Sequence, residues 1–283
     1  MQSLKQIKNR IRSIENTKKV TNAMQMISVT KLNRINKRLY AVRPYLLKLE
    51  SLMNNILSSF ETIDNTFITP RSEVKRIALC VITSDGGLCG VYNNNILRLA
   101  DKFINETGES KISLEVVGKT GFNHFKKRGI HLSNSYLGNN GRYSDALADK
   151  IANNLTSSYL SGSVDEVYVA FTRYGTTMVN KPELVKFLNL ERNRGQKIEY
   201  YLEPSAERVV QTIISRFVFA RFRLLLLEAF TSEHAARSVA MKMATDNAKD
   251  LLQALILFRN KVRQASITQD MMEIISSSEA LRG

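Results

Sequence analysis

Glycine is confined to the middle of the chain, and this distribution constrains the fold more than any other feature of the sequence. Of the 13 glycines, all but the terminal Gly283 lie between Gly86 and Gly195. Glycine in a helix interior costs about 1 kcal/mol relative to alanine. The glycine-free stretches 1–85 and 196–282 can therefore each hold one long helix, and the predicted order is helix, α/β insert, helix.

Apolar residues recur at intervals of three and four in both stretches, which is the pattern of a coiled-coil seam. It predicts helices over about residues 3–57 and 205–278, with lengths of about 80 Å and 110 Å. We expect the two helices to pair as an antiparallel coiled coil that projects from a smaller domain. The first seam contains Leu4, Ile7, Ile11, Ile14, Leu32, Ile35, Leu39, Val42, Leu46, Leu49, Met53 and Ile56, and the second contains Val210, Ile213, Phe217, Ala220, Leu224, Leu227, Ala248, Leu252, Leu255 and Val262.

Polar residues interrupt each seam, over about three turns in the first and about two in the second. A polar seam residue can specify the register of a coiled coil; alternatively, neighbouring subunits enclose the helices at these positions. We interpret His234 as a packed or hydrogen-bonding residue rather than a catalyst. Pro44 is expected to kink the first helix or to weaken one turn. The polar seam positions are Lys18, Thr21, Gln25 and Ser28, then Thr231, His234 and Ser238.

The insert alternates strand-like and helix-like segments, which predicts an α/β domain with a parallel core and Rossmann-like winding. The expected domains are an N-terminal coiled-coil helix (1–57), a linker (58–74), the α/β domain (75–204) and a C-terminal coiled-coil helix (205–283). Predicted strands cover residues 76–83, 112–118, 165–173, 183–190 and 197–202, and predicted helices cover 93–106 and 144–160.

The motif SDGGLCG, residues 84–90, follows the first predicted strand, where many enzymes cradle a phosphate. It lacks the Gly-Lys-Ser/Thr ending of a Walker loop and the GxGxxG pattern of dinucleotide-binding proteins. We interpret it as a strand-to-helix turn that needs positive φ, and we expect no bound cofactor. Cys89 is a possible nucleophile, but no His or Asp partner is visible in the sequence, so a small turn residue is the simpler interpretation.

The distribution of charge and of possible metal ligands argues against several classes of function. The net charge is +15, and residues 1–57 hold 12 Lys+Arg against 2 Asp+Glu. These cations fall all around the predicted helix, with Tyr40 and Tyr45 as its only aromatic residues, which is a poor footprint for nucleic acid. A solvated surface or a helix surrounded by acidic partners fits better. The two cysteines and three histidines have no metal-ligand spacing, and no apolar run reaches the ~20 residues of a membrane span.

Three helical segments carry a family resemblance. Residues 7–34 read IKNRIRSIENTKKVTNAMQMISVTKLNR, residues 233–252 read EHAARSVAMKMATDNAKDLL, and residues 260–275 read NKVRQASITQDMMEII. The first closely resembles the N-terminal helix of the gamma subunit of F-type ATP synthases, and the other two look like that family's C-terminal signature. SDGGLCG is similar to the family's Ser-Asp-Arg-Gly-Leu-Cys-Gly turn. The resemblance spans essentially the whole chain.

The resemblance implies a central rotor shaft with no catalytic residues of its own. Such a shaft turns inside a ring of alpha and beta subunits, while its α/β foot rests, with the epsilon subunit, on the membrane ring of c subunits. Ion-driven rotation is thereby coupled to ATP synthesis in the beta subunits. The resemblance implies neither a cofactor nor nucleic acid as a partner, and membrane contact only through the ring.

The family's contacts with the beta subunit match six positions of this chain. Gly86 departs from the family, which has arginine there, and Asp270 replaces the usual glutamate. The ending SSSEALRG also lacks the usual small, apolar texture. The matching positions are Met26, Lys31, Arg263, Gln264, Thr268 and Asp270.

Two other function classes compete with this interpretation. One is a basic coiled-coil protein that binds nucleic acid or acts as a scaffold, and the other is a nucleotide-binding enzyme that uses the α/β insert. Neither would require the C-terminal signature. The expected location is the cytoplasmic face of a bacterial plasma membrane, or alternatively an organellar inner membrane after removal of a presequence.

Overall fold

The structure is a computed structural model that describes residues 4–59, 65–71, 73–177, 179–190, 200–203 and 205–280. The chain forms two units: one combines residues 1–27 with 238–283, and the other contains residues 28–237. Each unit is described by itself below.

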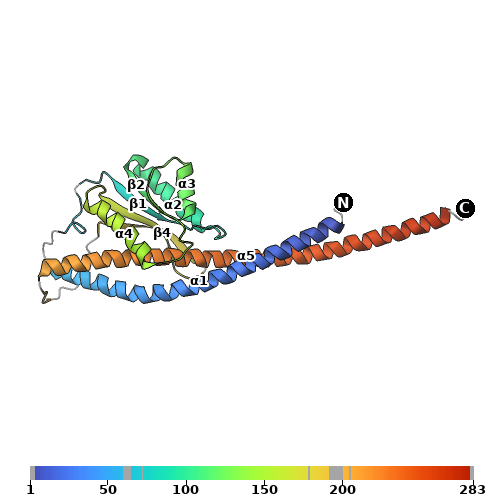
Figure 1. Ribbon diagram of the computed structural model, residues 1–283, viewed down its shortest axis with the longest axis horizontal. Helices are drawn as coiled ribbons and strands as arrows, with labels where there is room; N and C mark the ends of the chain where they lie inside the picture. Colours follow the sequence, from blue (N-terminus) through green and yellow to red (C-terminus); the bar gives the residue numbers. More distant parts are fainter. Residues whose placement is uncertain are drawn as a thin grey trace. The chain divides into compact units, whose positions relative to one another are not determined.

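Two long helices begin in one unit and end in the other. α1 spans Leu4–Ser59 and runs through Pro44 without interruption, and α5 spans Ala206–Ala280. These confirm the expectation of long terminal helices around an α/β insert (Figure 1). None of the described helices carries an apolar stretch of the length and hydropathy needed to cross a membrane.

A five-stranded sheet forms the centre of the larger unit. Its strands are β1 (Ile77–Ile82), β2 (Ile112–Val117), β3 (Leu132–Tyr136), β4 (Glu166–Tyr174) and β5 (Asn180–Leu188). Their order is β3-β2-β1-β4-β5, with the first four parallel and β5 antiparallel to β4. This order is that of a doubly wound sheet, as the Rossmann-like expectation requires.

Helices cover both faces of the sheet (Figure 1). α2 (Tyr92–Thr107) and α3 (Lys119–Lys127) pack on one face, where alternate residues of β1 and β2 meet Ile96 and Phe125. α4 (Asp145–Leu160) packs on the other face, in one apolar core with residues 28–59 of α1 and 206–237 of α5. The α/β domain and this part of the helix pair therefore share a core.

Polar contacts also connect the α/β domain to α5. Arg223 makes two hydrogen bonds to the carboxylate of Asp149 on α4, at 2.8 and 2.7 Å. The ring of Phe222 meets that of Phe187 at the end of β5, with centroids 5.6 Å apart. Ser232 Oγ donates to the carbonyl of Thr172 on β4 at 3.0 Å. These contacts fix α5 against α4, β4 and β5.

The middle of α5 is buried on every side. All residues from 225 to 235 are buried, including Thr231 and His234, two of the three positions that break the predicted seam. The hydroxyl of Thr231 donates to the carbonyl of Leu227, which satisfies it within the helix. The alternative that neighbouring subunits enclose this interruption is therefore wrong, because residues of the chain's own larger unit already bury it.

The smaller unit is held by a short seam. Ile7 and Ile11 of α1 pack with Leu252 and Leu255 of α5, as the heptad pattern predicts. Further along, the hydroxyl of Thr245 donates to that of Thr21 at 2.8 Å, so one of the polar seam positions is paired within the unit.

The sequence patterns located most elements of the α/β domain but missed two. β1, β2 and β4 and the helices α2 and α4 lie where predicted, and β5 begins three residues before the predicted 183. β3 was missed because its sequence LSNSY is polar, as suits an edge strand with four of five residues at least partly exposed. α3 was missed because it is short and contains Gly121. The strand predicted at 197–202 is wrong for residues 200–202, which are not in a strand, while 197–199 lie outside the described residues.

Candidate functional site

The turn at residues 84–90 begins at the carboxyl end of β1, between β2 and β4. The helices after β1 and β2 cover one face of the sheet, and α4, which precedes β4, covers the other. This is the topological switch point, where open α/β sheets usually bind ligands. The geometry of the turn therefore decides between a ligand site and a structural joint.

Asp85 occupies the backbone donors at this point. Its carboxylate accepts hydrogen bonds from the N–H groups of Lys119, Gly138 and Asn140, at 3.0, 3.1 and 2.6 Å. Lys119 is the first residue of α3, and helix N-terminal N–H groups commonly bind the phosphates of a nucleotide. Here the chain's own carboxylate takes the place that such an anion would occupy.

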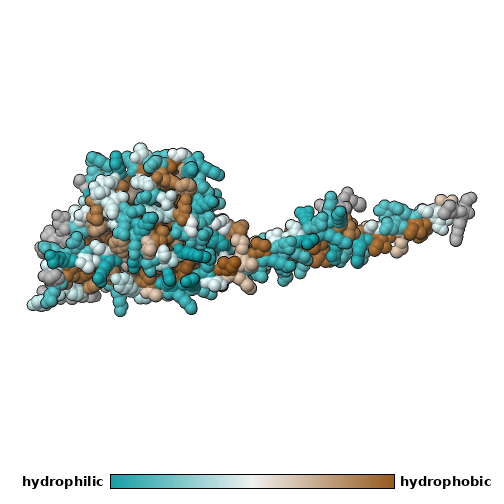
Figure 2. Space-filling view, viewed as in Figure 1, coloured by the Kyte–Doolittle hydropathy of each residue, from teal (hydrophilic) through white to brown (hydrophobic). Residues whose placement is uncertain are grey.

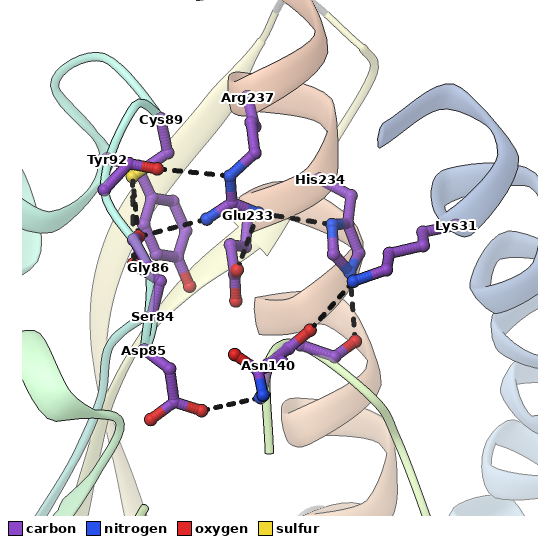
Figure 3. A network of polar contacts seen from close by, with 12 residues as sticks. Lys31, Ser84, Asp85, Gly86, Cys89, Tyr92, Asn140, Glu233, His234 and Arg237 are labelled. Atoms are coloured by element: carbon purple, nitrogen blue, oxygen red, sulfur yellow. Dashed lines mark hydrogen bonds and ion pairs between the residues drawn. The ribbon is translucent and has the colours of Figure 1, made fainter. Parts of the chain in front are cut away.

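Arg237 of α5 holds the other side of the turn (Figure 3). Its guanidinium donates to the carbonyls of Gly86 and Gly87 at 3.1 and 3.2 Å. A Cβ atom at position 86 would lie 3.8 Å from Arg237 Nη2, at an ordinary contact distance. Gly86, a departure from the family pattern, is thus a position where α5 approaches the turn.

The backbone of the turn differs in detail from the prediction. Positive φ occurs at Leu88 (61°) and Gly90 (60°), whereas neither Gly86 nor Gly87 has it. Gly90 therefore confirms the expected left-handed turn, and the two earlier glycines do not require it. Leu88 adopts this conformation despite its side chain, which the sequence did not indicate.

Cys89 is part of a small polar cluster rather than a catalytic pair. Its Sγ lies 3.2 Å from Asn93 Nδ2 and 3.8 Å from Ser84 Oγ, and Asn93 Oδ1 also accepts from the backbone N–H of Ser84. None of these partners is a base that could take the thiol proton. This supports the interpretation of Cys89 as a buried turn residue.

Glu233 and His234 are buried directly below the turn, each only 1% exposed. Glu233 Oε1 pairs with Arg237 Nη1 at 2.8 Å, while Oε2 is buried without a hydrogen-bond partner among the described residues. Burial raises the pKa of Glu233, and the charge of Arg237 partly opposes that rise. His234 Nε2 meets the carbonyl of Gly141 at 3.0 Å, and burial lowers the pKa of this histidine to about 4, which keeps the ring neutral at pH 7.

The turn, α5 and the loop after β3 thus form one polar network (Figure 3). Tyr92 adds a hydrogen bond from its hydroxyl to the carbonyl of Ala229 at 3.0 Å. The network is crowded, since a Cβ atom on Gly141 would lie 2.6 Å from His234 Nε2. The switch point is therefore a joint between the sheet and α5, and no cluster of metal-ligating residues occurs in the part of the chain that the structure describes.

Comparison with known proteins identifies the family of this chain. The family model described as ATP synthase matches residues 3–281. The ATP synthase gamma chain of Chlorobium phaeobacteroides strain BS1 is 35% identical, and that of Alkaliphilus metalliredigens is 38% identical; the matches cover 100% and 99% of both chains, respectively. The chain belongs to the ATP synthase gamma family. A rotor chain of the Euglena gracilis mitochondrial ATP synthase has the same fold, with 17% identity, a TM-score of 0.64, and coverage of 93% of this chain and 98% of the other.

Membership of the gamma family favours one of the competing interpretations of function over the others. Nothing in the comparisons supports the nucleic-acid or scaffold alternative. The α/β insert is also no reason to infer a nucleotide-binding enzyme, because its switch point is filled by Asp85 and Arg237. The chain is a gamma subunit of an ATP synthase, and the resemblance seen in the sequence is confirmed.

The six predicted contact positions are divided between the two units. In the smaller unit, Arg263, Gln264, Thr268 and Asp270 are exposed on α5, and Met26 of α1 is 65% exposed. Lys31 belongs to the larger unit, where it is half-buried and donates from Nζ to the carbonyl of Asn140 at 3.2 Å. Five of the six positions therefore belong to the smaller unit.

The residues of the polar network were not predicted as a site. Glu233, His234 and Arg237 lie in the quoted C-terminal segment, but their contact with a turn 150 residues earlier in the chain was not predicted. The available signal was the polar break of the seam at Thr231 and His234, together with the i, i+4 spacing of Glu233 and Arg237.

Proposed function

We propose that this chain is the rotating shaft of its ATP synthase and performs no bond chemistry itself. The observation that carries this proposal is the C-terminal part of α5, where every side chain from 263 to 278 is exposed. Five large apolar residues lie among them: Ile267, Met271, Met272, Ile274 and Ile275 are 47–69% exposed.

These apolar residues follow the helical repeat. Ile267, Met271 and Ile274 are spaced i, i+4 and i+7, so they share one face of α5. Brown side chains recur along this end of the helix in the space-filling view (Figure 2). An exposed apolar face of this extent marks a protein-binding surface. It suits a helix end that turns inside a ring of alpha and beta subunits.

The predicted beta-subunit contacts border this apolar face. Arg263 and Asp270 are two turns apart and lie along one edge of it, while Gln264 and Thr268 are one turn apart on the same side as Met272. The hydroxyl of Thr268 donates to the backbone carbonyl of Gln264 at 3.0 Å, so this hydroxyl is satisfied within the helix. We propose that these four residues, with Met26 and Lys31, contact the moving loop of the beta subunit.

In this proposal the α/β domain is the foot of the shaft. It would rest, together with the epsilon subunit, on the membrane ring of c subunits. The chain is part of a membrane-associated complex, and we place it at the cytoplasmic face of a bacterial plasma membrane. The predicted domains at 1–57, 58–74, 75–204 and 205–283 would then serve as shaft, linker, foot and shaft.

The double substitution Arg263→Ala/Gln264→Ala tests the contact with the beta subunit. In a complex reassembled from the full chain and cognate alpha and beta subunits, we expect ATP hydrolysis to fall about tenfold, because several charge-assisted hydrogen bonds are lost. The stability of the isolated chain should not change, because both side chains are exposed.

A matched control is Lys249→Ala/Lys261→Ala, which also changes two exposed residues of α5. It should retain most of the activity. Equal rates in the contact variant, the control and the unmodified complex would contradict the proposed role of Arg263 and Gln264.

A further inference from the structure

A concave basic pocket lies between α1 and the loop that follows β3, within the larger unit. It encloses about 450 Å³. Lys31, Arg34 and Arg38 reach it from one face of α1, and Arg142 and Tyr143 reach it from the loop. Ile35, which is 6% exposed, provides an apolar floor. The pocket shares Lys31 and Gly141 with the polar network at the turn, but Arg34, Arg38 and Arg142 take no part in that network.

The spacing of the α1 residues explains why the cations converge. Lys31, Arg34 and Arg38 occupy positions i, i+3 and i+7, which lie on one face of a helix. Arg38 is held over the ring of Tyr143, with its guanidinium carbon 5.8 Å from the ring centroid. Lys31 is held by its hydrogen bond to the carbonyl of Asn140 (Figure 3). Two of the cations are thus positioned before any ligand arrives.

No carboxylate of the described chain neutralises this pocket. None of its four cations forms an ion pair with a described Asp or Glu, although ten ion pairs form elsewhere. Three carboxylates lie nearby, and each has another partner: Asp145 accepts the hydroxyl of Tyr143 at 2.7 Å, Asp149 pairs with Arg223, and the buried Glu233, which also interacts electrostatically with Lys31, pairs with Arg237. Four like charges around one cavity repel one another, so an anion bound there would gain from all of them.

We propose that this pocket binds a compact polyphosphate anion, such as pyrophosphate or the phosphate chain of a nucleotide. Guanidinium groups bind phosphate oxygens in pairs of parallel hydrogen bonds, and three of the four cations are arginines. The volume lies in the range of small-molecule pockets, ~300–1,000 Å³. A concave site with several cations suits a dense, multiply charged ligand better than an extended peptide, whose carboxylates are spread along the backbone.

Calorimetric titration of the full chain with pyrophosphate tests the proposal. We expect saturable binding of one ligand per chain, and about tenfold weaker binding in Arg34→Gln/Arg38→Gln, because two charge-assisted contacts are removed. The matched control is Arg10→Gln/Arg12→Gln, which removes the same charge from exposed positions of α1 outside the pocket. It should change the affinity less than about twofold, since only long-range attraction is affected. Arg142→Gln, on the opposite wall, should weaken binding independently.

Further ligands identify which part of a polyphosphate is recognised. Equal affinities for pyrophosphate and ATP would assign the pocket to phosphates alone, whereas tighter binding of ATP would assign a contact to the base as well; both outcomes support the proposal. Absence of saturable binding, or equal weakening in both double variants, would overturn it. Stoichiometric binding of an Asp/Glu-rich peptide without binding of pyrophosphate would also overturn it, in favour of a protein partner.

Discussion

Replacing Arg237 with methionine is expected to destabilise the larger unit by about 3–5 kcal/mol, because it leaves a buried carboxylate without its partner. The side chains of Arg237 and Glu233 are only 12% and 2% exposed, and their salt bridge is 2.8 Å long. The substitution also removes the two hydrogen bonds to the carbonyls of Gly86 and Gly87. Urea unfolding followed by circular dichroism measures the loss, and hydrogen exchange of residues 84–93 should rise with it.

A double-substitution cycle separates these effects. Arg237→Met/Glu233→Gln should be more stable than Arg237→Met alone, because the buried charge is gone. The matched control is Arg216→Met, an exposed arginine of the same helix, which should change stability by less than about 0.5 kcal/mol. If Arg237→Met unfolds no more easily than Arg216→Met, the turn and α5 are not joined in the way described.

The substitution Gly118→Ala should destabilise the α/β domain by at least about 3 kcal/mol, because backbone strain and a steric clash add together. Gly118 follows β2 with φ of 95°, a conformation that alanine rarely adopts. A Cβ atom there would lie 2.3 Å from the carbonyl oxygen of Thr83, the residue just before the turn. Because the obstacle is backbone, the clash can be relieved only by moving the ends of β1 and β2 apart. Thermal and urea unfolding both measure this.

Gly129→Ala is a matched control for the conformational part of this effect. Gly129 also has positive φ, 76°, but a Cβ atom there would meet nothing within 4 Å. We expect a cost of about 1–2 kcal/mol, from the left-handed backbone alone. Equal losses in the two variants would show that the close approach of Gly118 to Thr83 does not hold the strand ends together.

The long helices and the parallel winding of the sheet core could be predicted because their signals are local and repetitive. The seam residues Ile7, Ile11, Leu252 and Leu255 pack as the heptad indicates, and the alternation of strands and helices predicted parallel winding. The expectation of a left-handed turn after the first strand is likewise confirmed at Gly90. In each case a few neighbouring residues contain the whole signal.

The polar network could not be predicted from the sequence, because the residues that form it are far apart in the chain. Arg237 meets a turn 150 residues earlier, and His234 meets a glycine 93 residues earlier. The basic pocket was missed for the same reason. Charges on α1 were expected to be spread around the helix, and only the fold shows that Arg142 and Tyr143 join Lys31, Arg34 and Arg38. No periodicity connects these segments.

Rotation of this chain within an assembled complex tests the central claim most directly. Cys80 and Cys89 are buried, so Lys127→Cys would provide an exposed thiol on the α/β domain for attaching a bead. With cognate alpha and beta subunits fixed to a surface, we predict that ATP drives the bead in one direction and that removing ATP stops it. A complex that hydrolyses ATP while the bead stays fixed, or a failure of this chain to assemble with those subunits, would contradict the proposal that it is the shaft.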